Sequence, residues 1–135
     1  MSARALLLCR LGLCLVVSGC AAALHSSARE PVVVEQLFFG RNHGGAQVVS
    51  DSLWSDFLAQ TVTPRFPNGY TVLASVGQWR GADGRSEREA GFVLELVHPA
   101  SAAADSSIRA IVAAYEARFQ QESVLRVVLS GHAAF

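Results

Sequence analysis

Residues 92–129, FVLELVHPASAAADSSIRAIVAAYEARFQQESVLRVVL, decide the fold because they contain a strand, a helix and another strand in succession. The segment 92–98 is rich in β-branched and aromatic residues and ends at Pro99, which is typical of a strand. Asp105 or Ser106 is expected to cap a helix with apolar positions at intervals of three and four residues. Those positions are Ile108, Ile111, Val112, Tyr115 and Phe119. Residues 124–129 are again β-branched and apolar, which predicts the second strand.

The preceding part of the chain shows the same order of elements. Residues 31–39 (PVVVEQLFF) predict a strand that ends at Gly40. Ser50 or Asp51 is expected to cap a helix that Pro64 terminates. Its apolar face is formed by Leu53, Trp54, Phe57, Leu58 and Val62. Residues 70–79 predict another strand, and Asp83-Gly84 in the loop 81–84 favours a hairpin to the strand at 92–98.

The resulting order, β-α-β-β-α-β, predicts an α+β fold of the ferredoxin-like, split-βαβ type. In this fold four strands form one antiparallel sheet in the order 4-1-3-2, and both helices cover one face. The other face is half apolar in this chain, since the strand at 92–98 carries Phe92 and Leu94 on one side and Val93 and Val97 on the other. Such a face needs a cover. Either the C-terminal tail folds over it or two copies pack sheet to sheet, and we expect a homodimer.

The first twenty residues resemble the leader of a bacterial lipoprotein. Arg4 and Arg10 precede a seven-residue apolar stretch at 11–17, and small residues follow it, as in a signal peptide. Residues 17–20 (VSGC) resemble a lipobox, in which Cys20 would carry the lipid after removal of residues 1–19. An ordinary secretory leader is the alternative. Residues 20–30 are expected to be a tether, and residues 31–135 a single domain.

This leader predicts a membrane partner and a location. The lipid would anchor the protein in the bacterial cell envelope, because several acyl chains bind a membrane stably where one does not. Ala21 follows Cys20, which the rule for Gram-negative lipoproteins associates with the outer membrane, facing the periplasm. The apolar stretch at 11–17 is too short for a transmembrane helix.

Composition excludes several classes of function. The chain carries 11 basic and 11 acidic residues, and with Arg4 and Arg10 in the leader the remainder is slightly acidic, which argues against nucleic-acid binding. All three cysteines, Cys9, Cys14 and Cys20, lie in the leader region, which excludes thiol catalysis and cysteine-based zinc sites in the domain. His25, His43, His98 and His132 show no metal-ligand spacing, so we expect neither a metal nor a cofactor.

The predicted topology brings five polar or aromatic residues to one end of the domain. They are Arg41, Gln78, Trp79, Arg80 and Glu122. Arg41 and Arg80 could clamp an anion or a carboxylate, with Trp79 as a stacking wall and Gln78 as a hydrogen-bonding group. The alternative is structural, with Glu122 bridging Arg80 or Arg41 to tie the ends of the strands together.

Two further features favour structural roles. Arg65 lies at the end of the first helix, where it is expected to bond terminal carbonyls at the pole opposite Arg41. Residues 40–45 (GRNHGG) are glycine-rich between a strand and a helix, as in phosphate-binding loops. They lack the Gly-Lys-Ser/Thr ending of a P-loop, so we expect a surface loop.

Several strings of the chain resemble domain-of-unknown-function family 3574, which comprises small bacterial proteins, many of them predicted lipoproteins. These strings are LFFGR at 37–41, VTPRFPNGYTVL at 62–73, GQWRG at 77–81 and ESVL at 122–125. The resemblance covers nearly all of the domain but implies no reaction, because the family has none assigned.

The sequence therefore predicts a non-catalytic, membrane-anchored envelope module that binds a small ligand or a protein. No nucleophile elbow or other catalytic motif is present. The alternative is a small cofactor-independent enzyme of the dimeric ferredoxin-like type, of the monooxygenase or isomerase class, which rests on analogy of fold.

Overall fold

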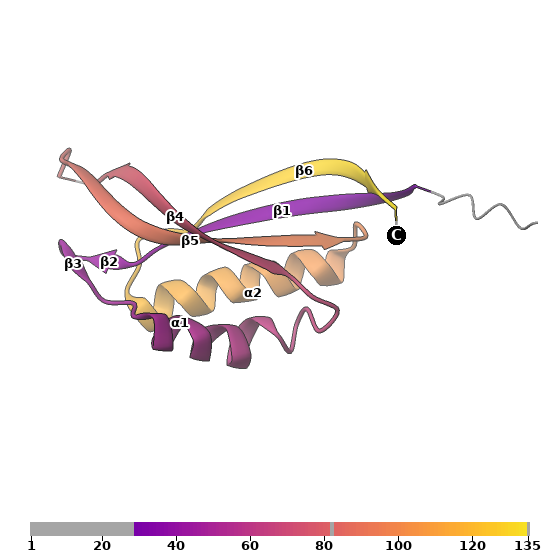
Figure 1. Ribbon diagram of the computed structural model, residues 1–135, viewed down its shortest axis with the longest axis horizontal. Coiled ribbons are helices and arrows are strands. Elements are labelled where there is room, and N and C mark those ends of the chain that lie inside the picture. The colour runs from indigo at the N-terminus through magenta and orange to yellow at the C-terminus, as the bar shows by residue number, and fades with distance from the viewer. Residues whose placement is uncertain (1–28, 82, 135) are drawn as a thin grey trace, which may run out of the picture.

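The computed structural model describes residues 29–81 and 83–134 and confirms the predicted α+β fold. Four antiparallel strands form one sheet in the order β4-β5-β1-β6, which is the predicted order read from the other edge. Both helices lie beneath the same face of this sheet (Figure 1). The elements are β1 (Glu30–Gly40), β2 (Asn42–His43), β3 (Ala46–Gln47), α1 (Asp51–Phe57), the π-helical turn η1 (Leu58–Val62), β4 (Thr71–Arg80), β5 (Ser86–His98), α2 (Ala102–Phe119) and β6 (Leu125–Ala133).

The alternation of side chains along β1 divides the sheet into a helix-covered face and an open face. Leu37 and Phe39 are buried against the helices, whereas Phe38 between them is exposed on the other face. Phe38 lies directly opposite Val93 of β5 and Leu125 of β6, so these three side chains share the open face.

Helix α1 begins where the sequence predicts and ends in a wider turn. The Ser50 hydroxyl accepts a hydrogen bond from the Leu53 amide at 3.2 Å, as an N-cap does. After Phe57 the helix widens, since the Thr63 amide bonds to the Leu58 carbonyl five residues back, at 2.9 Å. This extra residue in the turn keeps Val62 in the core just before Pro64.

Helix α2 begins one turn earlier than predicted. Its cap is Ser101, whose hydroxyl accepts a hydrogen bond from the Ala104 amide at 3.1 Å, so the expectation of Asp105 or Ser106 is wrong. Three alanines, the residue with the highest helix propensity, follow Ser101 and extend the helix toward the N-terminus. The predicted apolar face is confirmed, with Val112 half-buried and the other four positions buried.

Two strands are longer than the sequence predicts. β5 begins at Ser86 rather than at 92, because the turn at Gly84, which has a φ of 80°, lets β4 and β5 pair up to Arg80 and Ser86. β6 continues to Ala133 and pairs with β1 as far as Glu30. The tail up to residue 134 therefore lies beside β1 and leaves the open face uncovered (Figure 1).

Aromatic rings form the centre of the core. Phe39 packs against Trp54 and Tyr115 with ring centroids 5.1 and 4.6 Å apart. Trp54 also stacks on Phe92, at 4.6 Å and an interplanar angle of 7°. The Tyr115 hydroxyl donates a 2.7 Å hydrogen bond to the carbonyl of Gly40, and burial raises the pKa of this hydroxyl above its ordinary value of 10.0.

A buried ion cluster, which sequence reasoning missed, ties β6 to β1 and α2. Glu35 is only 2% exposed and receives two hydrogen bonds from Arg126, one of them 2.6 Å long. Arg126 also bonds to Asp105 at 2.8 Å, and this hydrogen bond holds the pKa of Asp105 below its usual value. His98 lies at the edge of the cluster, with its Nε2 3.8 Å from a Glu35 oxygen.

Replacement of Arg126 by Met should destabilise the protein strongly. The variant leaves Glu35 buried without its counter-charge, which typically costs about 3 kcal/mol of the free energy of unfolding. Urea denaturation measures this loss. Arg109→Met is the matched control, because Arg109 pairs with Asp105 at the surface and such pairs contribute less than about 1 kcal/mol. Equal losses in both variants would contradict the assigned role of Glu35.

Replacement of Tyr115 by Phe should remove an alkaline dependence of stability. Above pH 10, the unfolded chain loses the Tyr115 proton while the folded protein keeps it, so wild-type stability falls as pH rises. Tyr115→Phe should cost about 1 kcal/mol at neutral pH through the lost hydrogen bond. Above pH 10, the free energy of unfolding of this variant, measured by urea denaturation, should also decline less steeply than that of the wild type. An unchanged decline would show that Tyr115 does not cause it.

The predictions on the N-terminal leader lie outside the described residues. Signal peptide 1–19, Cys20 and the first part of the tether fall within residues 1–28 and therefore stay predictions. In the part of the chain that is described, no helix combines the length and the apolar character needed to cross a membrane.

Candidate active site

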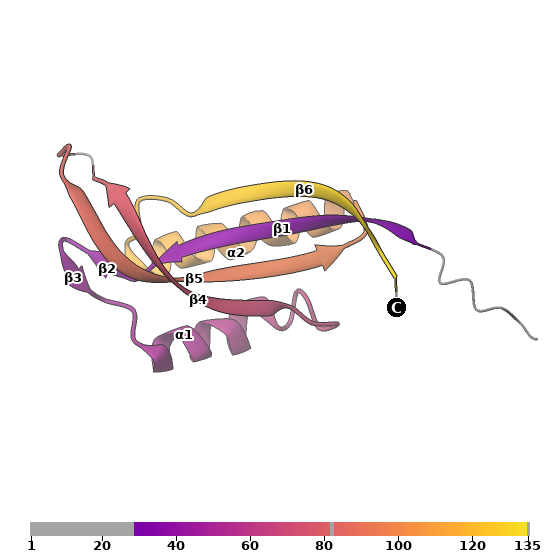
Figure 2. The same ribbon diagram turned by 45° about the horizontal axis from the view of Figure 1, so that its top comes forward.

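One end of the domain carries a cavity of about 540 Å³. β1, β4 and α2 end here and β6 begins here, as the topology predicts (Figure 2). The hairpin of β4 and β5 curls away from the helices, and the cavity lies between it, the β2 segment and the loop that joins α2 to β6. This volume is within the range of small-molecule sites.

Three of the five predicted site residues line the cavity. They are Gln78, Trp79 and Glu122, and Ser123 joins them. Arg41 and Arg80 are not among the lining residues. The predicted convergence of these three side chains is confirmed, whereas their role in binding a ligand stays a prediction.

Arg41 has a structural position instead of facing the cavity. Its guanidinium bonds to the Val49 carbonyl and to the Asp51 carboxylate, both at 2.8 Å, and lies 4.8 Å from the centroid of the Phe92 ring. These contacts tie the start of α1 to the end of the sheet. Arg80 lies exposed at the end of β4, and the described residues show no ion pair between Glu122 and either arginine. The two-arginine clamp is therefore not formed.

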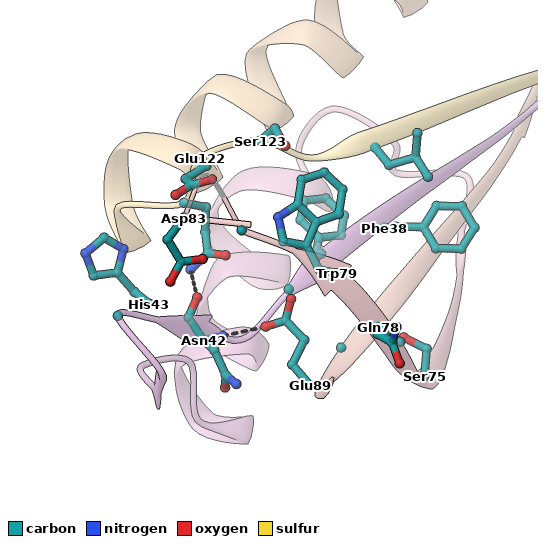
Figure 3. A pocket seen from close by; sticks show the side chains of 18 residues that line it. Phe38, Asn42, His43, Ser75, Gln78, Trp79, Asp83, Glu89, Glu122 and Ser123 are labelled. Atoms are coloured by element: carbon teal, nitrogen blue, oxygen red, sulfur yellow. Dashed lines mark hydrogen bonds between the residues drawn. The ribbon is translucent and has the colours of Figure 1, made fainter. Parts of the chain in front are cut away.

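Glu89 is the central carboxylate of the cavity. This half-buried residue of β5 accepts a hydrogen bond from the Asn42 amide at its Oε2, at 3.1 Å. The Gln121 side chain in turn donates to the Asn42 carbonyl at 3.0 Å, so both backbone polar groups of Asn42 are engaged. Figure 3 shows the Glu89 carboxylate pointing toward the Trp79 indole. Among the described residues, no hydrogen bond engages the second carboxylate oxygen, Oε1.

Two glycines make room for this arrangement. Gly40 and Gly91 lie opposite each other in the β1–β5 pair. A Cβ on Gly40 would lie 2.7 Å from Oε1 of Glu89, and a Cβ on Gly91 would lie 2.7 Å from the Phe39 carbonyl. Side chains at either position would therefore displace the carboxylate or the backbone at the floor of the cavity.

The charge of the cavity is negative. Its lining includes three carboxylates, Asp83, Glu89 and Glu122, together with His43, and no arginine among the described residues. Its aromatic surface comes from Phe38 and Trp79, and Trp79 is half exposed. This composition differs from the anion site expected from Arg41 and Arg80.

Sequence reasoning missed Glu89 because it placed residues 85–91 outside any strand. The signal was present in the turn. A tight turn at Asp83-Gly84 extends both strands of the hairpin toward it, and the resulting register places Glu89 directly opposite Gly77. Glu89 then lies on the same strand face as Gly91, at the end of the sheet where β1 stops.

The structure also tests the predictions for Arg65 and for the glycine-rich stretch 40–45. The Arg65 side chain donates to the Thr61 carbonyl at 2.7 Å, so its role at the helix end is confirmed. The Phe66 ring lies 5.8 Å from that of His98, at the pole away from the cavity. The glycine-rich stretch 40–45 forms the β2–β3 hairpin, with Gly44 and Gly45 at positive φ in its turn. Among the described residues, no three His, Cys, Asp or Glu side chains, those of the cavity included, lie close enough together to hold a metal ion.

The chain was compared with known families and structures. The family model described as "Protein of unknown function (DUF3574)" matches residues 34–135. No curated protein matches. Among solved structures, a phage SAM lyase in complex with S-methyl-5'-thioadenosine has a TM-score of 0.61 and 15% identity, covering 77% of this chain and 90% of that one. The phage SAM lyase in its apo state has a TM-score of 0.58 and 15% identity, covering 96% of each chain.

These structural neighbours correct the predicted function. The sequence favoured a non-catalytic binding module, but these two solved structures of similar fold are those of an enzyme. At 15% identity the likeness extends to the fold alone. This finding contradicts the preference for a non-catalytic module, which is therefore wrong.

Proposed function

Since this chain belongs to the DUF3574 family, whose function is unknown, we propose its activity from the cavity: a cofactor-independent enzyme of the lyase or isomerase class, with Glu89 as the general base. The observation that carries this proposal is the environment of Glu89. One of its oxygens is held by the Asn42 amide, while the other faces the cavity beside Trp79. A base must be oriented in this way while keeping a lone pair for the substrate.

The chemistry needs only a proton acceptor and a substrate with an acidified C–H bond. Glu89 Oε1 would take the proton, and the electron pair of that bond would form a double bond. In a lyase the electrons of a neighbouring bond then depart with the leaving group. In an isomerase an existing double bond of the substrate opens as the new one forms, and its electron pair takes the proton back from Glu89 at another carbon. Both routes balance without an external oxidant or reductant.

The structural neighbours favour the lyase class over the monooxygenase class. They are lyases that act on SAM, and one of them holds S-methyl-5'-thioadenosine. A monooxygenase would also need molecular oxygen in the balance, whereas a lyase or isomerase uses the carboxylate alone. The cavity, at about 540 Å³, is large enough for a small-molecule substrate such as SAM.

The full chain, purified in mild detergent, should change the composition of a bacterial metabolite extract. Untargeted mass spectrometry would follow which metabolites disappear and which appear. Glu89→Gln should lose this activity by at least about 100-fold, because Gln can still accept the Asn42 hydrogen bond but cannot accept a proton. In heavy water, an isomerase product should carry deuterium.

A matched variant keeps this test specific. Glu95→Gln makes the same substitution on the same strand, where Glu95 accepts a hydrogen bond from Gln36 outside the cavity. It should leave the activity unchanged. If wild type and Glu89→Gln leave the extract equally unaltered, the proposal of an enzyme with Glu89 as its base is refuted.

We also propose that a second copy covers the open face of the sheet. Exposed apolar side chains gather there on all four strands, at Leu73, Val97, Phe38, Leu125 and Leu129. Gln36 and Glu95, the polar groups in the middle of this face, bond to each other at 2.9 Å, which offsets part of the cost of covering them. Phe38 and Leu125 also line the cavity, so a second copy at this face would help to enclose it.

Leu129→Glu should convert a dimer into a folded monomer. The substitution places a charge in the proposed interface without touching the core, because Leu129 is half exposed. Native mass spectrometry would measure the oligomeric state. Val48→Glu, on the loop before α1, should leave the dimer intact. A wild-type chain that stays monomeric at tens of micromolar would contradict the proposal.

The lipid anchor at Cys20 remains a prediction from the sequence. If present, it would hold the enzyme at the membrane through residues 20–30, with the outer membrane of a Gram-negative cell as the expected location.

A further inference from the structure

We infer that the substrate of this cavity is an organic cation attached to a planar ring. The inference rests on the proposed function and specifies which molecules the active site accepts. Two properties of the lining residues support the inference: their negative charge and the aromatic rings on which a flat molecule can stack.

The charge of the cavity selects against anions. Asp83, Glu89 and Glu122 contribute three carboxylates to the lining, which contains no arginine among the described residues. Arg41 is bound to Asp51, and Arg85 lies 3.9 Å from Asp83 at the exposed rim. A cation entering this space meets negative groups on its floor and on its rim, where reduced solvent strengthens the attraction. An anion would be repelled by Glu89 and Glu122, for which the described residues show no ion pair.

The aromatic residues supply the second half of the recognition. Trp79 is 50% exposed and forms part of the cavity wall, in contrast to Trp54, which is 4% exposed in the core. Phe38 lies in the same cavity (Figure 3). Faces of tryptophan attract both cations and flat rings. A cation on a ring scaffold can therefore contact Glu89 and Trp79 together.

The glycines of the floor set how the cation reaches Glu89. Oε1 lies only 2.7 Å from where a Cβ of Gly40 would be, so the absence of that Cβ lets the carboxylate occupy the floor. Gly77 lies opposite Glu89 on β4, and a Cβ added to it would have no atom within 4 Å among those of other residues that are described. Space for a ligand therefore remains on the β4 side of the carboxylate.

Three adenosine compounds that differ in charge test the inference. S-adenosylmethionine carries a sulfonium cation, S-adenosylhomocysteine lacks only that charge and its methyl group, and adenosine monophosphate carries a phosphate. Binding to the full chain in mild detergent is followed by tryptophan fluorescence, in which only Trp79 is exposed. The sulfonium compound should bind at least about 10-fold more tightly than the thioether, and the phosphate compound most weakly.

Single substitutions test which side chains cause the preference for the sulfonium compound. Glu122→Gln should reduce the preference for the sulfonium over the thioether, and added salt should do the same. Asp56→Asn, an exposed acid of α1 outside the cavity, should leave the preference unchanged. Trp79→Phe should weaken both compounds. Calorimetry replaces fluorescence for that variant.

The result also separates this inference from the proposed function. Equal binding of sulfonium and thioether, tighter binding of the phosphate compound, or no binding at millimolar concentration would overturn the cation inference. Glu89-dependent turnover of a neutral or anionic metabolite in the extract would likewise overturn it while leaving the proposed enzyme standing. If the wild-type chain binds the sulfonium compound selectively but turns over no metabolite, only the proposed enzymatic activity is overturned.

Discussion

The hydrogen bond from the Tyr115 hydroxyl to the Gly40 carbonyl connects the core of this protein to its cavity. Tyr115 lies in the middle of the aromatic cluster, and Gly40 is the last residue of β1. Because this bond fixes where β1 ends against α2, it also fixes Asn42 two residues later, whose amide holds Glu89. A well-packed core thus determines the position of a carboxylate that is itself half exposed.

The carboxylates of Glu35 and Glu89 lie in contrasting environments in this fold. In the middle of β1, Glu35 is buried and its carboxylate is bonded twice by Arg126, so no oxygen is left for proton transfer. Beside the end of β1, Glu89 accepts one backbone hydrogen bond, and its other oxygen accepts none among the described residues. Burial with a counter-ion stabilises structure, whereas partial exposure without one leaves a carboxylate available for proton transfer.

The sequence was sufficient for the topology because the apolar period of α2 and the strands around it is strong. The ends of the elements were less predictable. Ser101 caps α2 ahead of an alanine run that has no amphipathic pattern, and β5 extends through 86–91, which lacks the apolar character of a strand. That extension carries Glu89, so an error in strand length concealed the central carboxylate. The topology alone was enough to predict that Gln78, Trp79 and Glu122 converge. It does not determine the direction of a side chain, and Arg41 points toward Asp51 rather than into the cavity.

The most direct test of the account is a crystal structure of the Glu89→Gln variant grown with S-adenosylmethionine. Removal of the proposed base should trap the ligand unreacted. The account predicts the ligand in the cavity, stacked on Trp79, with its sulfonium within about 6 Å of the ring and beside residue 89. A ligand bound elsewhere, or a sulfonium directed away from the three carboxylates, would contradict the claim that this cavity is the active site.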